Sequence, residues 1–397
     1  RPIRWFVALF DKDLLPFELA NVKSGNVSRG HRFLGTGDFT IESPAAYEET
    51  CKEHFLIVDP EVRKQMILEG LQKLADEKGG TIIMDDDLLE EVVYLVEYPT
   101  ALCGEFDEDY LKLPEAAIIT PMKDHQRYFP MRDKDGKLMN LFLTVRNGND
   151  YHLETVQHGN ERVLRARLDD AKFFFEEDKK HKLADYTEKL KKIVFQDGLG
   201  TLYDKAQRLE KITVFLNHKL DLGLDDAKLQ RASLLAKADL ATQMVMEFTE
   251  LQGVMGKEYA LIDGEDAGVA EAINEQYQPR FAGDVLPQTD MGKVLGIADK
   301  FDTITGMFSR GFIPPGSPDP FALRRQTIGT LNILMDAGWN LNCHEVFAFV
   351  LNLLGVEGED AAKVMGQLDD YFTLRLKNIF QDKAMDYNII DCVLASD

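Results

Sequence analysis

The chain has 397 residues, with 68 acidic and 46 basic side chains and a formal net charge of −22. This charge excludes non-specific binding of nucleic acid or anionic membrane over the whole surface, so contact with a polyanion needs a local basic patch. No apolar run approaches the ~20 residues of a membrane span. The four cysteines lie far apart, so we expect reduced thiols, no zinc site and a cytoplasmic protein without membrane contact.

The first part of the chain, residues 1–155, alternates strand-like and helix-like stretches. A long amphipathic helix is predicted from residue 60 to near residue 79. The stretches 127–132 and 137–145 flank Asp-Lys-Asp-Gly at 133–136, which is a strong hairpin signal. There is no GxGxxG motif and no phosphate-binding loop, so the sequence predicts an α+β domain rather than a doubly wound sheet.

A helix is predicted over residues 160–175, with Asn160 as its N-cap. Its apolar face recurs at helical spacing and comprises Leu164, Leu168, Ala171 and Phe175. Arg162 and Arg165 fall on the opposite side, with Arg167 on the flank.

Two interpretations of these arginines stay open. Glu161, Arg165 and Asp169 are spaced i, i+4, so the charges can form ion pairs within the helix. Alternatively, the arginines form a row of fixed cations for RNA phosphate.

From about residue 160 the strand signals disappear and amphipathic helices follow. We expect them at about 201–219, 225–247, 266–277, 291–308, 319–337, 344–355, 359–378 and 385–395. The predicted organisation is therefore an α+β domain at 1–155, an all-α domain at 156–340 and a helical segment at 341–397 that starts a further unit.

A second basic cluster lies before the predicted hairpin. Lys123, His125 and Arg127 are close together, and Tyr128 and Phe129 are adjacent. Cations beside aromatic rings can hold a phosphate and stack a base. They can equally form a cation–π and packing cluster. We treat all three basic residues as candidates for RNA or subunit contact.

A third basic pair follows a proline-lined loop at residues 311–320. Asp319 is suited to cap the helix that follows, and Arg324 and Arg325 lie in its early turns. Such a rigid loop and two arginines suit docking to a partner or to an RNA backbone. Fold architecture alone explains the motif equally well.

Two acids inside apolar helices, Asp239 and Asp299, are candidates for a metal site. Divalent metals of that kind usually want histidines alongside, and histidines are scarce in this part of the chain. Pairing of the acids with Lys237, Lys300 or helix termini is the favoured interpretation. We find no nucleophile–base pair or paired catalytic carboxylates, and we predict no catalytic residue and no metal site.

Several long motifs resemble one known family when taken in order. They are RPIRW at the start, GHRF at 30–33, TPMKDHQRYFP at 120–130, GNERVLRARLDDAKFF from 159, KADLATQMVMEFTELQGVMG, YQPRFAGDVLP, IADKFDTITGMF and GSPDPFALRR. Together they resemble the β subunit of bacterial heterotetrameric glycyl-tRNA synthetase, a glycine–tRNA ligase. Against that family the chain lacks an N-terminal segment and a C-terminal anticodon-binding domain, so we expect a fragment.

The resemblance implies a division of labour between two kinds of subunit. ATP-dependent glycine activation, with ATP and Mg, takes place on a separate α subunit of an α2β2 tetramer. This chain binds no cofactor, contributes binding of tRNA(Gly) and subunit assembly, has no DNA partner and is expected to be inactive alone.

The helical part also resembles the HD phosphohydrolase fold. Ala238-Asp239 stands where such an enzyme has His-Asp, and Asp299 matches its final Asp. The resemblance implies an HD-like domain that has lost its metal site. The alternatives are an HD-type metal-dependent phosphohydrolase that uses Asp239 and Asp299, or an RNA-binding scaffold.

Overall fold

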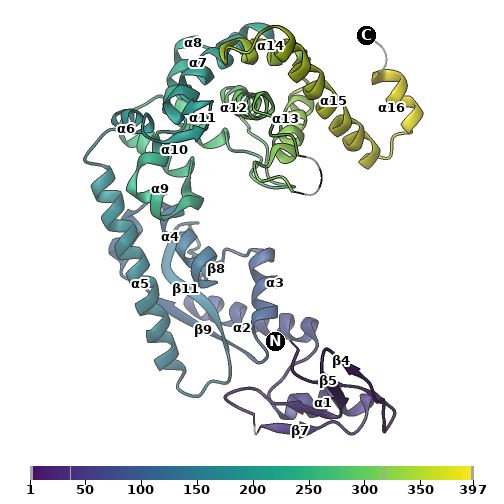
Figure 1. Ribbon diagram of the computed structural model, residues 1–397. Helices are drawn as coiled ribbons and strands as arrows, with labels where there is room; N and C mark the ends of the chain where they lie inside the picture. Colours follow the sequence, from purple (N-terminus) through teal and green to yellow (C-terminus); the bar gives the residue numbers. More distant parts are fainter. Residues whose placement is uncertain (1–2, 36, 315, 317, 395–397) are drawn as a thin grey trace. The chain divides into compact units, whose positions relative to one another are not determined.

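The computed structural model describes residues 3–35, 37–314, 316 and 318–394. The chain forms two compact units, Arg1–Phe173 (unit 1) and Phe174–Asp397 (unit 2) (Figure 1). Helix α5 (Leu153–Asp178) runs unbroken through this division, whereas the sequence prediction placed a domain boundary at 155/156. Among the described residues no helix is long and apolar enough to cross a membrane.

A four-stranded antiparallel sheet forms the centre of unit 1, in the order β8-β10-β11-β9. Its strands are β8 (Thr81–Ile82), β10 (Phe129–Arg132), β11 (Leu138–Asn147) and β9 (Pro99–Glu105). The predicted hairpin is confirmed, because β10 and β11 pair antiparallel. The Asp133 carboxylate accepts bonds from the N–H groups of Asp135 and Lys137, and Gly136 supplies a positive φ of 80°.

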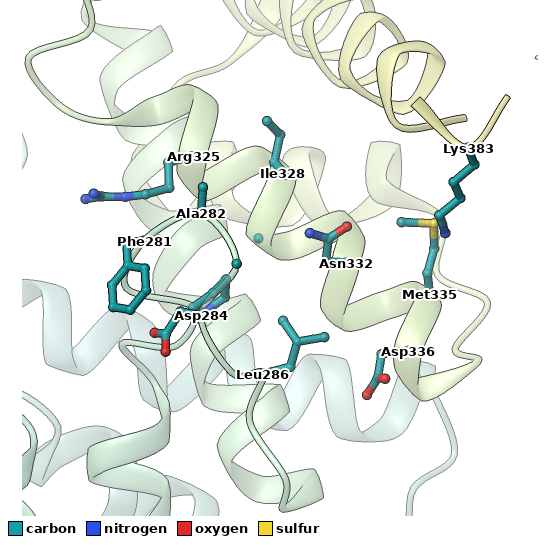
Figure 2. A pocket seen from close by; sticks show the side chains of 13 residues that line it. Phe281, Ala282, Asp284, Leu286, Arg325, Ile328, Asn332, Met335, Asp336 and Lys383 are labelled. Atoms are coloured by element: carbon teal, nitrogen blue, oxygen red, sulfur yellow. The ribbon is translucent and has the colours of Figure 1, made fainter. Parts of the chain in front are cut away.

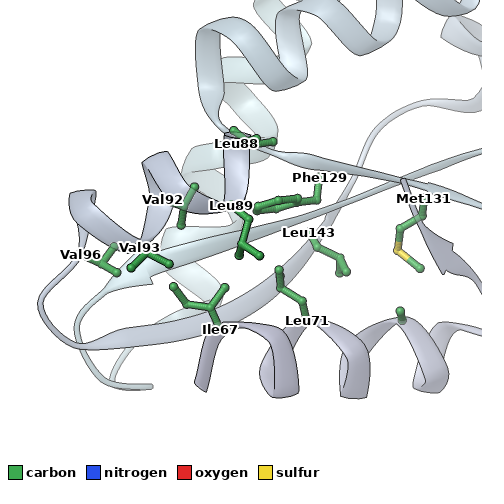
Figure 3. Packing of buried hydrophobic residues seen from close by; sticks show 11 residues of the cluster. Ile67, Leu71, Leu88, Leu89, Val92, Val93, Val96, Phe129, Met131 and Leu143 are labelled. Atoms are coloured by element: carbon green, nitrogen blue, oxygen red, sulfur yellow. The ribbon is translucent and has the colours of Figure 1, made fainter. Parts of the chain in front are cut away.

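The hydrophobic core of unit 1 lies between this sheet and two helices, α2 (Pro60–Lys78) and α3 (Asp86–Leu95) (Figure 3). Ile67, Leu71 and Ala75 recur every four residues on α2 and are at most 1% exposed. They pack in one cluster with residues of α3, β10 and β11, among them Val93, Phe129, Met131 and Leu143. The Asp59 side chain caps the start of α2, and Gly79 ends it in a left-handed conformation.

Short strands and one helix make a smaller cluster at the start of unit 1. Its elements are β1 (Phe6–Val7), β2 (Leu9–Phe10), β3 (Asp13–Leu14), β4 (Glu18–Leu19), β5 (Val22–Gly25), β6 (Val27–Arg29), β7 (Asp38–Thr40) and α1 (Tyr47–Glu53). Phe39, Ile41 and Cys51 form its buried core. The imidazole Nε2 of His31 lies 3.0 Å from Asn147 Oδ1 at the end of β11, which ties this cluster to the main sheet.

In its described residues, unit 2 has helices and one two-stranded hairpin, β12 (Val194–Gln196) and β13 (Gly200–Thr201). Its helices are α6 (Leu183–Leu190), α7 (Leu202–Lys219), α8 (Asp226–Leu235), α9 (Gln243–Glu247), α10 (Val254–Ile262), α11 (Ala267–Glu275), α12 (Asp290–Ser309), α13 (Leu323–Ala337), α14 (Cys343–Leu353), α15 (Gly358–Asp382) and α16 (Tyr387–Leu394). The predicted order of an α+β part followed by a helical part is confirmed. The HD-like assignment stays a prediction.

Helix α12 is the central element of unit 2, and α7, α11, α13, α14 and α15 pack around it (Figure 1). It is buried on every side, as expected for a helix without a single polar face. Phe301 contacts Phe347 of α14 and Phe372 of α15, with ring centroids 5.5 and 5.7 Å apart. Helices α14 and α15, which lie within the segment predicted at 341–397, thus pack on α12 in unit 2.

The start of α12 is fixed by a buried acid from α11. The Glu275 carboxylate is 3% exposed and accepts bonds from Gln288 N at 2.7 Å and from Thr289 N and Oγ1. Gly292 makes room for it, since a Cβ there would lie 1.9 Å from Glu275 Oε2. A negative side chain at this position also suits the positive end of the α12 dipole.

One test concerns the core beneath α2. Leu71→Ala should lower the free energy of unfolding by about 2–5 kcal/mol, because it leaves a cavity in a fully buried site. Denaturant unfolding would measure this change. Val62→Ala on the same helix is the matched control, since Val62 is 48% exposed and its loss should cost within about 0.5 kcal/mol. Equal effects of the two substitutions would contradict the described core.

Candidate functional site

The candidate basic residues of α5 keep their predicted sides of the helix. Leu164, Leu168 and Ala171 are fully buried, and Arg162 and Arg165 are exposed. The helix begins at Leu153, so the prediction of Asn160 as N-cap is wrong. The turn that starts the helix lies upstream, where Leu153 N donates to Asp150 O.

The ion pairs of Arg165 with Glu161 and Asp169 do not form, because both acids bind other groups of unit 1. Glu161 is 9% exposed and accepts bonds from Glu105 N at 3.1 Å and from Gln157 Nε2 at 2.8 Å. Asp169 accepts a 2.5 Å bond from the Tyr110 hydroxyl. Within the described part of the chain, Arg162 and Arg165 therefore have no carboxylate partner. Arg167 is half-buried.

The cluster before the hairpin is engaged by acids of the α3 region. Lys123 forms an ion pair with Asp85, the N-cap of α3, and Arg127 Nε lies 2.8 Å from Glu91 Oε1. His125 is half-buried in the same short helical segment, Pro121–His125. The structure thus brings the three residues together, and two of them neutralise carboxylates. Their role in RNA or subunit contact stays a prediction.

The third pair lies at the start of α13, as the sequence predicts. Asp319 accepts bonds from Leu323 N at 2.9 Å and Arg324 N at 2.8 Å, so it caps the helix. Arg324 is half-buried, whereas Arg325 is exposed and has no ion-pair partner among the described residues. A role of either arginine in RNA or subunit contact is untested.

Unit 2 contains a buried ion cluster centred on two acids of α12, Asp299 and Asp302. Lys205 of α7 lies 3.0 Å from a carboxylate oxygen of each acid, and Lys237 Nζ lies 3.0 Å from Asp299 Oδ2. Arg208 Nε lies 2.5 Å from Asp302 Oδ1. The predicted pairing of Asp299 with Lys237 is confirmed. Although burial acts to raise the pKa of Asp299, Lys205 and Lys237 hold this pKa below its usual value.

Asp239 and Lys300 lie beside this cluster and have other partners. The fully buried Asp239 carboxylate accepts a 2.6 Å bond from Gly253 N, and burial raises the pKa of Asp239 to about 6. Gly253 is the N-cap of α10, so Asp239 binds a helix terminus, which is one of the predicted kinds of partner. Lys300 Nζ donates instead to the carbonyl oxygens of Gln276 at 3.1 Å and Gln278 at 2.8 Å. No group of three or more His, Cys, Asp or Glu side chains in the described ranges could hold a metal ion.

Sequence reasoning missed three members of the ion cluster: Lys205, Arg208 and Asp302. A signal was present in their spacing. Lys205 and Arg208 share a helical face with buried Leu209 and Ile212, and Asp302 follows Asp299 by three residues in the buried part of α12. Opposite charges on the apolar faces of two helices indicate that the helices pack together.

The two units together match a sequence model for a family of aminoacyl-tRNA synthetase subunits. That family is described as "Glycyl-tRNA synthetase beta subunit", the match covers residues 1–395, and the chain belongs to it.

Similar proteins named glycine–tRNA ligase beta subunit occur in several bacteria. The chain is 48% identical to the one from Desulforamulus reducens over 400 residues, 49% to that of Clostridioides difficile over 397 residues and 48% to that of Bacillus subtilis over 397 residues. Each match covers 100% of this chain and 57–58% of the relative. The chain therefore spans a little under three fifths of the length of these relatives.

The ion cluster predicts a large effect of Asp302→Asn on stability. The substitution leaves Arg208 and Lys205 short of a buried negative charge, and we expect a loss of about 3–5 kcal/mol in the free energy of unfolding. Asp290→Asn on the same helix is the control, because Asp290 is 55% exposed and its loss should cost at most about 1 kcal/mol. Denaturant unfolding compares the two variants, and similar values would argue against the cluster.

A second prediction concerns the pH dependence of stability. Because the pKa of Asp239 is raised to about 6, this carboxyl binds a proton more tightly in the folded chain than in the unfolded chain. Its stabilising contribution is complete below about pH 4 and is lost as the pH rises through about 6. Asp239→Asn should remove this loss, so the variant should gain stability relative to the parent between pH 4 and pH 7, on the order of 3 kcal/mol. A difference in unfolding free energy that does not vary with pH would contradict this assignment.

Proposed function

We propose that this chain is the tRNA-binding and assembly part of a glycine–tRNA ligase β subunit. In this proposal glycine activation, with ATP and Mg, belongs to a separate α subunit of a cytoplasmic α2β2 enzyme that charges tRNA(Gly). The observation that carries the RNA contact is the pair of exposed arginines on α5, which have no carboxylate partner among the described residues.

The two arginines are informative because the chain as a whole is acidic. On a protein with a formal net charge of −22 acids outnumber cations, and the half-buried Lys123 and Arg127 are both paired with acids. Arg162 and Arg165 stay unpaired because Glu161 and Asp169 bind Glu105 N and the Tyr110 hydroxyl. Guanidinium groups without a carboxylate partner are suited to bidentate contact with phosphate oxygens.

The same arginines could instead contact acids of the α subunit. The two possibilities differ in their dependence on salt, because release of counterions from RNA gives a steep, linear fall of log affinity with log salt concentration. RNA contact is the one we propose, since the family name concerns tRNA.

The helical unit does not favour the alternative of a metal-dependent phosphohydrolase. The ammonium groups of Lys205 and Lys237 form ion pairs with the Asp299 carboxylate, and the backbone N–H of Gly253 donates to Asp239. We retain the HD-like scaffold as part of the proposal, on the positions of Ala238-Asp239 and Asp299 in the sequence. In this view lysines fill the space of a lost metal site.

Charge reversal on α5 tests the RNA contact. Arg165→Glu should lower the affinity of the chain for tRNA by about tenfold or more and should reduce the salt slope by about 1. Lys134→Glu is the matched control, because it makes the same charge change at an exposed turn of the hairpin and should leave affinity nearly unchanged. If both variants bind tRNA as the parent does, and both are folded, the α5 contact is wrong.

The division of labour has a separate test. The chain alone should form no glycyl-tRNA from glycine, ATP and tRNA(Gly), because in this proposal glycine activation belongs to the α subunit. Charging by the chain in the absence of any α subunit, measured with labelled glycine, would overturn the proposal.

A further inference from the structure

A cavity of about 380 Å³ lies beside the buried ion cluster of unit 2. Its walls come from α7, α12, the start of α13 and the loop that follows α11. It is large enough for a mononucleotide-sized molecule. Because all its lining residues lie in unit 2, the cavity belongs to a single compact unit.

Positive charge predominates in the lining of this cavity. One carboxylate, that of Asp299, faces five cationic side chains, which are Lys205, Lys237, Arg280, Lys300 and Arg325. Asp302, Asp239 and Asp284 are not part of the lining. Asp302 pairs with Arg208 and Lys205, Asp239 binds Gly253 N, and Asp284 binds Arg280 N. Burial and the neighbouring cations lower the pKa of Lys300 to about 8, although Asp299 opposes this change. Cationic side chains therefore outnumber carboxylates in the lining of the site.

Three buried polar atoms of the lining have no hydrogen-bond partner within the described part of the chain. One is Asp299 Oδ1, which lies 3.0 Å from Lys205 Nζ as an ion pair. The other two are the hydroxyl of Tyr277 and the side-chain oxygen of Gln276. An unpartnered buried polar group costs free energy, so such atoms indicate a ligand that completes their bonds. The Tyr277 hydroxyl can donate to an anion, whereas the Gln276 oxygen can only accept. The ligand must therefore carry an N–H or O–H group as well as an acidic group.

Aromatic rings complete the cavity. Phe195, Tyr277 and Phe321 are part of its lining. Lys205 Nζ lies 4.4 Å from the Phe195 ring centroid, and Lys237 Nζ lies 4.3 Å from that of Tyr277. Rings of this kind stack on a planar base, and the cations beside them suit a phosphate.

Arg325 connects this cavity with a larger one of about 660 Å³, because it lines both, together with Pro279. Figure 2 shows Arg325 extending from α13 on the side of the loop that carries Phe281 and Asp284. Arg325 is exposed and has no ion-pair partner among the described residues, so its guanidinium group is available to a ligand at the mouth of the cavity.

We propose that this cavity binds a nucleoside phosphate, either free or at the end of an RNA strand. Lys237, Lys205 and Arg325 face the phosphate, the Tyr277 hydroxyl donates to it, and the Gln276 oxygen accepts from the ribose or the base. The site goes beyond the proposed function, because neither arginine of α5 takes part in it.

Titration calorimetry of the chain with AMP tests the proposal, with adenosine and inorganic phosphate as partial ligands. AMP should bind saturably at one site, and each partial ligand should bind at least about tenfold more weakly, since each lacks half of the contacts. Absence of saturable AMP binding, or equal binding of AMP and adenosine, would overturn the site.

Two variants keep the test independent of folding. Tyr277→Phe removes a hydroxyl that has no partner in the protein, so thermal unfolding should be unchanged or shifted upward while AMP affinity falls several-fold. Arg325→Gln removes an exposed cation and should weaken AMP by about tenfold. Lys211→Gln, an exposed position of α7, is the matched charge control and should bind AMP as the parent does. Parent-like AMP affinity in both pocket variants would refute the assignment.

A competition experiment identifies the source of the nucleotide. If a short single-stranded RNA displaces AMP, and if the same two substitutions lower the affinity for this RNA, the cavity binds an RNA end. If AMP binds and the RNA does not displace it, the cavity binds a free nucleotide. Arg165→Glu should leave AMP affinity unchanged. Failure of the cavity and failure of the α5 contact are therefore separable.

Discussion

Unit 2 depends on neutralising the negative charge that α12 carries into its core. Asp302 is fully buried, and Asp299 is nearly so. An unpaired buried carboxylate is prohibitively costly, so α7 has to place Lys205 and Arg208 against this helix, and the chain after α8 has to place Lys237 there. The packing of these segments is thus set by charge as well as by apolar contact. The surplus of cations over acids in the adjoining cavity follows from the same arrangement.

The basic residues of this acidic chain fall into two groups with different physical roles. Lys123, Arg127 and Arg208 neutralise carboxylates that the fold brings close, and their charge is used within the protein. Arg165 and Arg325 are exposed, and the nearby acids have other partners. Sequence proximity did not separate these groups, because Asp169 lies one helical turn from Arg165 and still binds Tyr110. The second group has no acid partner among the described residues, so its charge is available for binding another molecule.

Local signals in the sequence predicted much of the fold and less of the candidate sites. The turn residues at 133–136 predicted the β10–β11 hairpin, and the spacing of Leu164, Leu168 and Ala171 predicted the buried face of α5, because both patterns depend on neighbouring residues only. The helix expected at 225–247 breaks after α8, and Asp239 lies in a short 3₁₀ turn there. Its bond to Gly253 N joins residues that local propensity does not relate. Tertiary contacts of this kind determine the walls of the cavity, and the periodicity of the sequence could not predict them.

Glu275 is the last residue of α11, and its carboxylate binds Gln288 N and Thr289 N at the start of α12. These bonds join the two ends of the loop between α11 and α12. The intervening residues, which include Tyr277, Pro279 and Arg280, form one wall of the cavity. Closing a loop of this length costs conformational entropy, which grows only slowly with the number of residues. In this protein the loop is closed when the chain folds, without a ligand. A ligand entering the cavity therefore meets a wall that is already ordered, and little of its binding free energy is lost to arranging the chain.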